Sequence, residues 1–349
     1  NILYKMKLSQ FKYPIPKNLI AKAPKAPRDM AKMMVLNRED ESILTSKFKS
    51  IVDYVNEGDV IVMNDSKVFP ARMFGTKEKT RAKIEVFLLR QLNAEENIWD
   101  VVVDPARKVR IGNRIFFNKN LYCEVIDNTT SRGRIVRFNV TEDFSKVIDK
   151  LGKTPLPPYI KREPTEKDKA DYQTVFAKNV GSVAAPASGL HFTPELLKKL
   201  KDKGVKLAYI TLHVGLGTFR LVEVEDLSKH RMDSEYFEIT KENADIINNA
   251  VTKKGKLVAV GTSVARVLEA NIVTTKTIRH GKGWTDKFIH PPHTLRVVDK
   301  LITNFQLPQS TLLMLVCSFA GRDFIMKAYK RAIKEKYRFY AYGDAMLIV

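Results

Sequence analysis

The chain has 349 residues and carries 60 Lys and Arg against 39 Asp and Glu, so its formal net charge at pH 7 is +21. This length suggests about two domains, and a hydrophobic fraction of 44% excludes wholesale disorder. The longest apolar stretch, at residues 312–320, is too short to cross a bilayer, which takes roughly twenty residues.

Two further properties bound the class of protein. The cysteines are two, Cys123 and Cys317, which excludes a disulfide scaffold and a cysteine-based zinc cluster. The first residues contain no apolar run typical of a secretory signal. We therefore expect a soluble cytoplasmic protein, and the positive charge favours a polyanionic partner such as nucleic acid.

The first 140 residues of the chain contain short strand-like runs. MMVLNR at residues 33–38 is one of them. From residue 59 to residue 138 the runs DVIVMN, KIEVFLLR, IWDVVV, RIFF, LYCEVI and RIVRFNV follow one another, separated by turn signals. Several short strands at this spacing predict a small β-barrel or sandwich.

After Gly152 strands and helices alternate. A helix begins at residues 193–195, because Thr caps it, Pro suits its first turn and Glu suits its positive end. Strands are expected at 205–212, 257–262 and 301–305, and further helices at 240–254, 264–270 and 310–319. The pattern predicts an α/β fold with a largely parallel sheet and flanking helices. We expect a discontinuous α/β domain at 1–66 and 152–349, with a β-barrel-like domain inserted at 67–151.

Common cofactor and metal motifs are missing. The sequence has no GxGxxG, no GxxxxGK[ST] and no HExxH. His290 and His293 are close in sequence, but no Cys or acidic cluster adjoins them, so a rigid proline loop is favoured over a metal site. We expect no bound metal.

Four segments carry possible chemistry, each with a structural alternative. The small residues that precede His191 leave room for a ligand or simply pack tightly. The turn after His213 contains Gly215 and Gly217, which either let the backbone approach a ligand or only close a loop. Residues 64–72 are either a polar strand end that faces a site or an ordinary turn. The aromatic and basic residues in 337–346 either stack on a base or form a final core strand.

Taken in order, these and other segments resemble one known family, the QueA family of S-adenosylmethionine:tRNA ribosyltransferase-isomerases of queuosine biosynthesis. The resemblance covers nearly the whole chain. It rests on the motifs NDSKVFPAR, WDVVVDPARKVRIGN, TPLPPYIKR, YQTVFAKNVGSVAAPASGLHFT, TLHVGLGTF, HRMDSE, GTSVAR, GWTDKFIHPP, TNFQLPQSTLLMLV and YRFYAYGDAMLI.

The resemblance implies a reaction and its substrates. The ribosyl part of S-adenosylmethionine would be transferred to 7-aminomethyl-7-deazaguanine at the wobble position of tRNA and rearranged to an epoxycyclopentane. Epoxyqueuosine would form, and adenine and methionine would leave. S-adenosylmethionine would be consumed as a co-substrate, so no cofactor is expected, and we expect a monomer that binds tRNA and no membrane.

The chemistry of that reaction asks for particular side chains. A base must take a proton from the 5′ carbon, and an acid must assist the departure of adenine. Carboxylates would bind the cationic part of the donor, and cationic side chains would bind the carboxylate of the donor. The candidate catalytic residues are His191, His213 and Asp344. The candidate substrate-binding residues are Asp65, Arg72, Arg107, Thr193, Gly215, Gly217, Glu235, Arg266, Asp286 and Tyr342.

Two of these candidates carry definite expectations. Asp344 lies in an apolar and aromatic segment, where a carboxylate needs a partner, either the donor or an Arg such as Arg338. His191 lies just before a helix start, and positive neighbours would lower its pKa. We expect a catalytic role for both.

The chain departs from the family pattern at several positions. Ala187 and Ser188 stand where the family usually has Thr and Ala, Gln306 stands where it has His, and smaller departures occur at Asp233, Ser263 and His293. Gln306 cannot carry a proton at pH 7. This leaves an alternative, a catalytically impaired tRNA-binding relative. A conventional methyltransferase is disfavoured, because its glycine-rich strand-turn-helix is missing.

Overall fold

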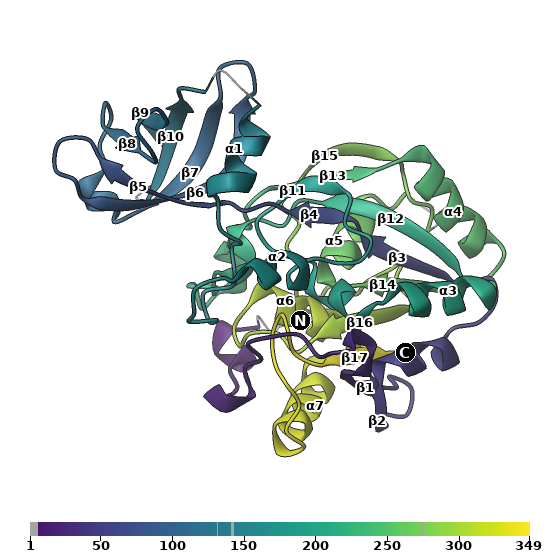
Figure 1. Cartoon of the computed structure of the whole chain (residues 1–349). Coiled ribbons are helices and arrows are strands. Elements are labelled where there is room, and N and C mark those ends of the chain that lie inside the picture. The colour runs from purple at the N-terminus through teal and green to yellow at the C-terminus, as the bar shows by residue number, and fades with distance from the viewer. Residues whose placement is uncertain (1–5, 131, 141–142, 274–275) are drawn as a thin grey trace.

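The computed structural model of the chain describes residues 6–130, 132–140, 143–273 and 276–349. Figure 1 shows a small β-barrel, at the upper left, beside a larger body built on a mixed sheet. The fold class predicted from the sequence, an α/β sheet layer with an added β-barrel, is therefore confirmed.

The body is organised around a nine-stranded sheet with a parallel centre. Strands β12, β3, β14 and β16 run parallel to one another, and the flanking pairs are antiparallel except for β17 with β1. The strand order across the sheet is β15 (Gly281–Thr285), β13 (Glu235–Ile239), β12 (Lys206–Leu212), β3 (Val60–Asn64), β14 (Leu257–Val260), β16 (Lys300–Asn304), β17 (Ala345–Ile348), β1 (Lys32–Leu36) and β2 (Ile43–Lys47).

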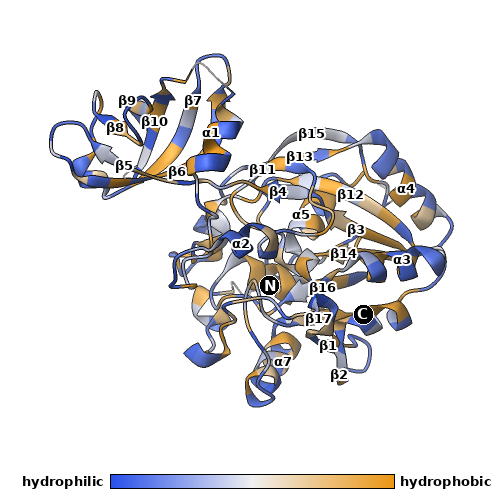
Figure 2. Cartoon of the chain, in the orientation of Figure 1, coloured by the Kyte–Doolittle hydropathy of each residue, from blue (hydrophilic) through white to orange (hydrophobic). Residues whose placement is uncertain are grey.

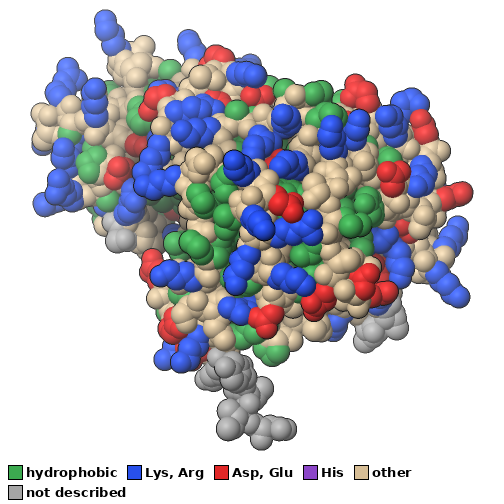
Figure 3. All heavy atoms as spheres, turned by 90° about the horizontal axis from the view of Figure 1, so that it is seen from below, with side chains coloured by type: hydrophobic (Ala, Val, Ile, Leu, Met, Phe, Trp, Pro, Cys, Tyr) green, Lys and Arg blue, Asp and Glu red, His purple; other side chains and the backbone are tan. Residues whose placement is uncertain are grey.

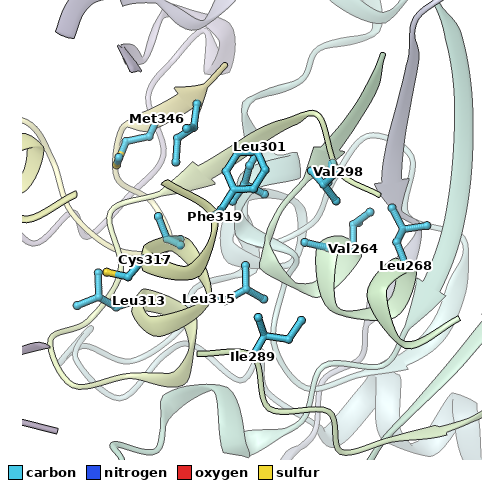
Figure 4. Close-up of a cluster of buried hydrophobic side chains, with 14 of the residues drawn as sticks. Val264, Leu268, Ile289, Val298, Leu301, Leu313, Leu315, Cys317, Phe319 and Met346 are labelled. Carbon is cyan, nitrogen blue, oxygen red and sulfur yellow. The ribbon is translucent and has the colours of Figure 1, made fainter. Parts of the chain in front are cut away.

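Both faces of this sheet are covered. Successive residues of β3 point to opposite faces, so Val60 and Val62 join one hydrophobic cluster while Ile61 and Met63 join another. This explains why central strands read as continuous apolar runs, coloured orange in Figure 2. On one face, α5 (Thr262–Ala270) and α6 (Thr311–Ala320) pack on the sheet through side chains such as Val264 and Leu315 (Figure 4).

The helices begin where their capping residues predict. Thr193, Thr240 and Ser310 each accept a hydrogen bond from a backbone N–H in the first turn of α3, α4 and α6. The helices of the described residues are α1 (Phe144–Leu151), α2 (Glu166–Asp171), α3 (Pro194–Asp202), α4 (Lys241–Thr252), α5 (Thr262–Ala270), α6 (Thr311–Ala320) and α7 (Arg322–Lys334). None of them is long and apolar enough to span a bilayer.

The barrel closes on itself in the order β10, β7, β6, β5, β8, β9. Its strands are β5 (Arg72–Lys77), β6 (Lys83–Asn93), β7 (Ile98–Asp104), β8 (Arg114–Phe116), β9 (Tyr122–Asn128) and β10 (Gly133–Phe138). Alternate side chains fill its interior, among them Val86, Val101 and Cys123. Helix α1 packs against it through Phe144, which contacts the rings of Trp99 and Phe138.

The chain enters and leaves the barrel at neighbouring points. Before the barrel, β4 (Ser66–Val68) pairs in parallel with β11 (Asn179–Ser182) of the body. At the entry, the N–H groups of Arg72 and Lys153 each donate to the carbonyl of the other residue. An inserted barrel is consistent with this path, and the division at 66/67 and 151/152 stays a prediction.

One expected strand is shorter than its sequence suggests. The segment 337–346 was a candidate final core strand, but β17 begins only at Ala345. The preceding residues turn instead, with Tyr340 at a φ of 70°. The side chains of Tyr337, Tyr340 and Tyr342 are buried, so they are not exposed platforms for a base.

Candidate active site

A cavity of about 450 Å³ lies where the parallel strands end. Its lining comes from segments that follow three strands: Val214 and Gly217 after β12, Thr262 after β14, and Asn304 and Gln306 at the end of β16. The carboxyl ends of parallel strands meet at one edge of a sheet, which is where α/β proteins bind ligands. We call this hollow the strand-end cavity.

A buried ion pair forms part of its wall. Glu235 at the start of β13 and Arg266 on α5 are 7% and 8% exposed, and their carboxylate and guanidinium groups contact each other. Glu235 also accepts a hydrogen bond from the N–H of Gly215 at 2.7 Å. Burial lowers the pKa of Arg266 to about 10, so the side chain is charged at pH 7. Three residues predicted separately from the sequence thus meet at one place.

Aromatic rings and cations complete the cavity. Tyr159, Phe219 and Tyr340 contribute rings, and Arg220 and Arg231 contribute positive charge. Tyr159 and Tyr340 contact each other, with ring centroids 4.9 Å apart. Apolar walls with a few polar groups are typical of small-molecule sites.

A second and larger hollow, of about 1630 Å³, lies between the barrel and the sheet. The barrel side contributes Trp99 and Arg90, and the sheet side contributes His213, Tyr236 and Trp284. We call it the interdomain cleft. The cleft and the strand-end cavity share part of their walls, and the residues that line both are Val214, Gly217, Arg220, Asp233 and Glu235.

His213 lines the interdomain cleft and is held in a fixed orientation. Its Nδ1 lies 2.8 Å from the hydroxyl of Ser66, which in turn contacts the hydroxyl of Ser182 at 2.6 Å. The imidazole stacks on Tyr236. Burial lowers its pKa, so the ring is neutral at pH 7 and can accept a proton. Gly181 borders the ring closely, since a Cβ there would lie 2.5 Å from Nε2.

His191 occupies a different environment from the one expected. It lies in a short 3-10 helix, is 5% exposed, and is outside the residues that line the two hollows. Its Nε2 contacts the side-chain oxygen of Asn304 at 3.0 Å, and its ring packs on Phe48. Burial is the main cause that lowers its pKa, to about 4, and the positive charges of Arg338 and Arg28 lower it further. Its catalytic role stays a prediction, while the geometry favours positioning of Asn304.

Asp344 has the partner that the structural alternative named. The carboxylate accepts hydrogen bonds from the backbone N–H groups of Arg338 and Lys32, and it forms an ion pair with the Arg338 guanidinium at 3.4 Å. Asp344 is 3% exposed and lines neither hollow. The buried carboxylate is thus satisfied within the protein, and no donor is needed to explain it.

The remaining candidates do not gather at the strand-end cavity. Asp65 accepts hydrogen bonds from Thr211 and Asn179, and Thr193 caps α3. Arg72 forms an ion pair with Glu85 on the barrel. Three more candidates, Arg107 on the barrel, the exposed Asp286 after β15, and the buried Tyr342, also lie outside both linings.

Sequence reasoning missed several residues that line the cavity. Tyr159, Asn304 and Thr262 belong to the motifs TPLPPYIKR, TNFQLPQSTLLMLV and GTSVAR, but no charge or ring nitrogen singled them out. Gln306, noted as a departure, does line the cavity, and its side chain donates to the hydroxyl of Thr303 at 2.9 Å. Position within a motif, at the end of a buried strand, was the signal that could have found them.

The two histidines of the proline loop line neither hollow. His290 contacts the carbonyl of Pro291, and His293 lies 3.7 Å from the buried carboxylate of Glu269. Among the described residues no group of three or more His, Cys, Asp and Glu converges in a way that could hold a metal ion.

The fold and these adjoining hollows define an α/β protein with an added β-barrel and with two hollows that share a wall. The model of the queuosine biosynthesis protein family matches residues 8–348, so the chain belongs to that family. The resemblance identified from the motifs is confirmed.

Individual relatives extend along the whole chain. The S-adenosylmethionine:tRNA ribosyltransferase-isomerase of Chloroherpeton thalassium is 56% identical and covers 98% of this chain and 100% of the relative. The protein of the same name from Cytophaga hutchinsonii is 54% identical, with 99% and 100% covered. A crystal structure of an S-adenosylmethionine tRNA ribosyltransferase from Thermotoga maritima is 35% identical, covers 97% of this chain and 100% of its own, and superposes with a TM-score of 0.55.

Proposed function

We propose that this chain is an S-adenosylmethionine:tRNA ribosyltransferase-isomerase of queuosine biosynthesis. It transfers the ribosyl part of S-adenosylmethionine to 7-aminomethyl-7-deazaguanine at the wobble position of tRNA and isomerises it, forming epoxyqueuosine and releasing adenine and methionine. S-adenosylmethionine is consumed as a co-substrate. The family membership and the names of the full-length relatives support this activity.

One observation carries the proposal: the strand-end cavity and the interdomain cleft share a wall that contains Gly217 and Glu235. A transfer reaction needs the donor and the acceptor to be in contact at the reacting atoms. A small donor in the cavity and a tRNA nucleotide in the cleft would meet at this wall.

The strand-end cavity suits the chemistry of the donor. Its volume of about 450 Å³ is within the range of small-molecule sites. The half-buried rings of Tyr159 and Phe219 offer stacking surface for adenine. Glu235 and Arg266 place both signs of charge on one wall, where the cationic and anionic groups of the methionine part need opposite partners.

His213 is the best-placed candidate base. Ser66 engages one ring nitrogen, so the other is available for a proton, and burial keeps the ring neutral. It lines the interdomain cleft together with Gly217 and Glu235 of the shared wall. His191, held by Asn304 outside both linings, would act only through that residue.

Release of adenine tests the proposal. The protein is mixed with S-adenosylmethionine and tRNA that carries the 7-deazaguanine base, and adenine, methionine and S-adenosylhomocysteine are quantified. The proposal predicts equal amounts of adenine and methionine that depend on the tRNA. Formation of S-adenosylhomocysteine instead would establish a methyltransferase and overturn it.

Gln306 keeps an alternative open, a catalytically impaired tRNA-binding relative. The residue lines the strand-end cavity, where the family usually has a proton-carrying His. That alternative predicts tRNA binding without adenine release. It also predicts that Gln306→His increases adenine release, whereas an enzyme adapted to Gln306 would lose activity on this change.

We further propose that the protein works as a monomer in the cytoplasm. Its tRNA substrate is a cytoplasmic molecule. Sedimentation analysis with and without tRNA tests the monomer.

A further inference from the structure

The interdomain cleft contains a large aromatic side chain that the packing of the protein leaves exposed. Trp284 on β15 is 53% exposed and lines this cleft. Trp99, on the barrel side, is only 8% exposed. Trp side chains bury more surface than most others and are enriched where proteins bind partners, so an exposed Trp in a cleft indicates a contact site.

Trp284 ends a row of rings that begins at His213. The imidazole of His213 stacks on Tyr236, with centroids 5.6 Å apart and an interplanar angle of 22°. Tyr236 in turn meets Trp284 edge to face, with centroids 5.8 Å apart. Because Tyr236 and Trp284 are direct partners on β13 and β15, the sheet fixes their spacing. The row links the candidate base to an exposed ring.

A cation from the barrel lies over the exposed ring. The guanidinium carbon of Arg90 is 5.1 Å from the centroid of the Trp284 ring, and Arg90 also pairs with Asp100 at 3.6 Å. Lys67 and Arg220 line the same cleft. Proteins bind single-stranded nucleic acid with this combination, in which rings stack on bases and cations contact the backbone.

We propose that Trp284 is a stacking platform for an unpaired base of the RNA substrate that neighbours the modified nucleotide, with Arg90 contacting the adjoining phosphate. The proposal rests on the proposed function, because it takes tRNA as the occupant of the cleft. The net charge of +21 favours a polyanion over an apolar peptide. The lining of the cleft itself holds three cations, Lys67, Arg90 and Arg220, beside six carboxylates, so the exposed ring carries the proposal. Unpaired bases of RNA loops are the usual partners of such rings.

The two tryptophans of the chain make a direct test possible. The full-length protein is titrated with a synthetic RNA hairpin that reproduces the anticodon arm, and Trp fluorescence is measured together with the anisotropy of a labelled hairpin. We expect stacking to quench the emission of the wild-type protein. In Trp284→Phe only Trp99 emits, and because Trp99 lines the cleft but is only 8% exposed, we expect most of the quenching to be lost. The affinity should change by less than about threefold, because Phe still stacks.

Removal of the Trp284 ring measures how much stacking contributes to hairpin affinity. Trp284→Ala weakens hairpin binding by about 5- to 150-fold, the range for the loss of one stacked base. Phe74→Ala is the matched control. Like Trp284, Phe74 is an exposed ring beside cations: it is 44% exposed, and the Arg72 guanidinium carbon and the Lys153 Nζ are 5.4 Å and 5.0 Å from its ring centroid. Unlike Trp284, it is outside the lining of the cleft. We expect its substitution to leave hairpin binding unchanged.

Three results would overturn the platform: quenching that persists in Trp284→Phe, wild-type affinity in Trp284→Ala, or an equal loss of affinity in Phe74→Ala. A Trp284→Ala variant with a lower melting temperature and unchanged hairpin affinity would show that Trp284 only bridges the barrel and the sheet. Absence of adenine release by the wild-type protein would refute the proposed function, whereas the hairpin titration would still decide the role of Trp284.

Discussion

At the scale of single residues, the Glu235–Arg266 pair sets the charge of the strand-end cavity. Both side chains are at most 10% exposed, so each charge depends on the other for its stability. Glu235→Gln leaves Arg266 charged and unpaired. We expect this to lower the free energy of unfolding by about 3–5 kcal/mol, as for other broken buried pairs, and to weaken S-adenosylmethionine binding. Urea unfolding and calorimetric titration measure the two effects.

Glu238→Gln is the control for that change. Glu238 is on the same strand, but it is only half-buried, and its carboxylate accepts a hydrogen bond from the Tyr236 hydroxyl. Its substitution should change stability by less than about 1 kcal/mol. If Glu235→Gln were equally mild, the pair would not be a determinant of the cavity.

His191 gives a prediction about pH. Its pKa is about 4 in the folded protein and about 6.5 in the unfolded chain. Below pH 6.5 the unfolded chain therefore binds a proton that the folded protein does not, and stability falls as the pH decreases toward 4. The group accounts for roughly 2 kcal/mol of stability lost between pH 7 and pH 5. His191→Gln should remove this part of the pH dependence, whereas substitution of the exposed His280 by Gln should not.

The same variant separates the two roles considered for His191. As a positioning residue it holds Asn304, whose side chain also donates to the carbonyl groups of Tyr340 and Ala341. Gln can still donate to Asn304, so we expect His191→Gln to lower turnover by less than about tenfold. A loss on the order of 10²–10⁴ with an unchanged melting temperature would instead establish the catalytic role expected from the sequence.

The sequence predicted some site residues and not others for a physical reason. His213, Glu235 and Gly217 follow or begin strands, and strand ends converge because parallel strands share one edge. Arg72 and Asp344 were candidate functional residues on the same grounds of charge and motif. Their side chains are directed to Glu85 and Arg338, and that direction depends on loop paths and on partners distant in sequence.

At the scale of elements, the β4–β11 pairing is what holds His213 in place. Ser66 on β4 and Ser182 on β11 form the hydrogen-bonded chain that reaches the imidazole. Gly181 lies between them at a φ of 155°, in a place where the register of β11 shifts. The absence of a side chain at Gly181 lets the strand pass directly beside the His213 ring.

Gly181→Ala is therefore expected to displace the imidazole. The added Cβ would lie 2.5 Å from Nε2, so the ring must move and its contact with Ser66 weakens. A displacement of about 1 Å can lower turnover on the order of 10²-fold, while binding of S-adenosylmethionine should change little. Steady-state kinetics and equilibrium binding measure these separately.

Gly112→Ala is the control for backbone strain. Gly112 on the barrel also has a positive φ, of 79°, but a Cβ there would meet nothing within 4 Å. It should lower stability without changing turnover of the folded protein. Turnover of Gly181→Ala within twofold of wild type would show that the position of His213 is not critical.

Hydrophobic pattern predicted the central elements better than the edge elements. Strands β3, β12 and β14 were expected because both faces of a central strand are buried, which makes their sequences continuously apolar. Strand β15, at the edge of the sheet, and β13, next to it, were not expected. They contain charged or small residues such as Glu238 and Lys282, and their pairing partners are distant in sequence.

At the scale of the whole molecule, the 60 Lys and Arg residues are spread along the chain rather than gathered in one segment. Lys and Arg side chains are scattered among acidic ones over the face shown in Figure 3. The cations relevant to the proposed RNA site are those that line the interdomain cleft, among them Lys67, Arg90 and Arg220. Specific binding should therefore depend on a few of the 60 basic residues.

This distribution leads to a prediction about salt. Each phosphate contact releases condensed counterions, so the logarithm of the tRNA association constant should fall linearly with the logarithm of the salt concentration. Lys67 is at an exposed position of the cleft. Lys67→Glu should weaken tRNA binding, and it should reduce the slope of that line by about one, the value for the loss of one phosphate contact. Lys330→Glu, at an exposed position of α7 on the side of the body away from the barrel (Figure 1), makes the same change of charge and should have little effect. Binding of S-adenosylmethionine should be unchanged in both variants. A tRNA affinity that stays constant between low and moderate salt, or that falls equally in the two variants, would contradict electrostatic binding in the cleft.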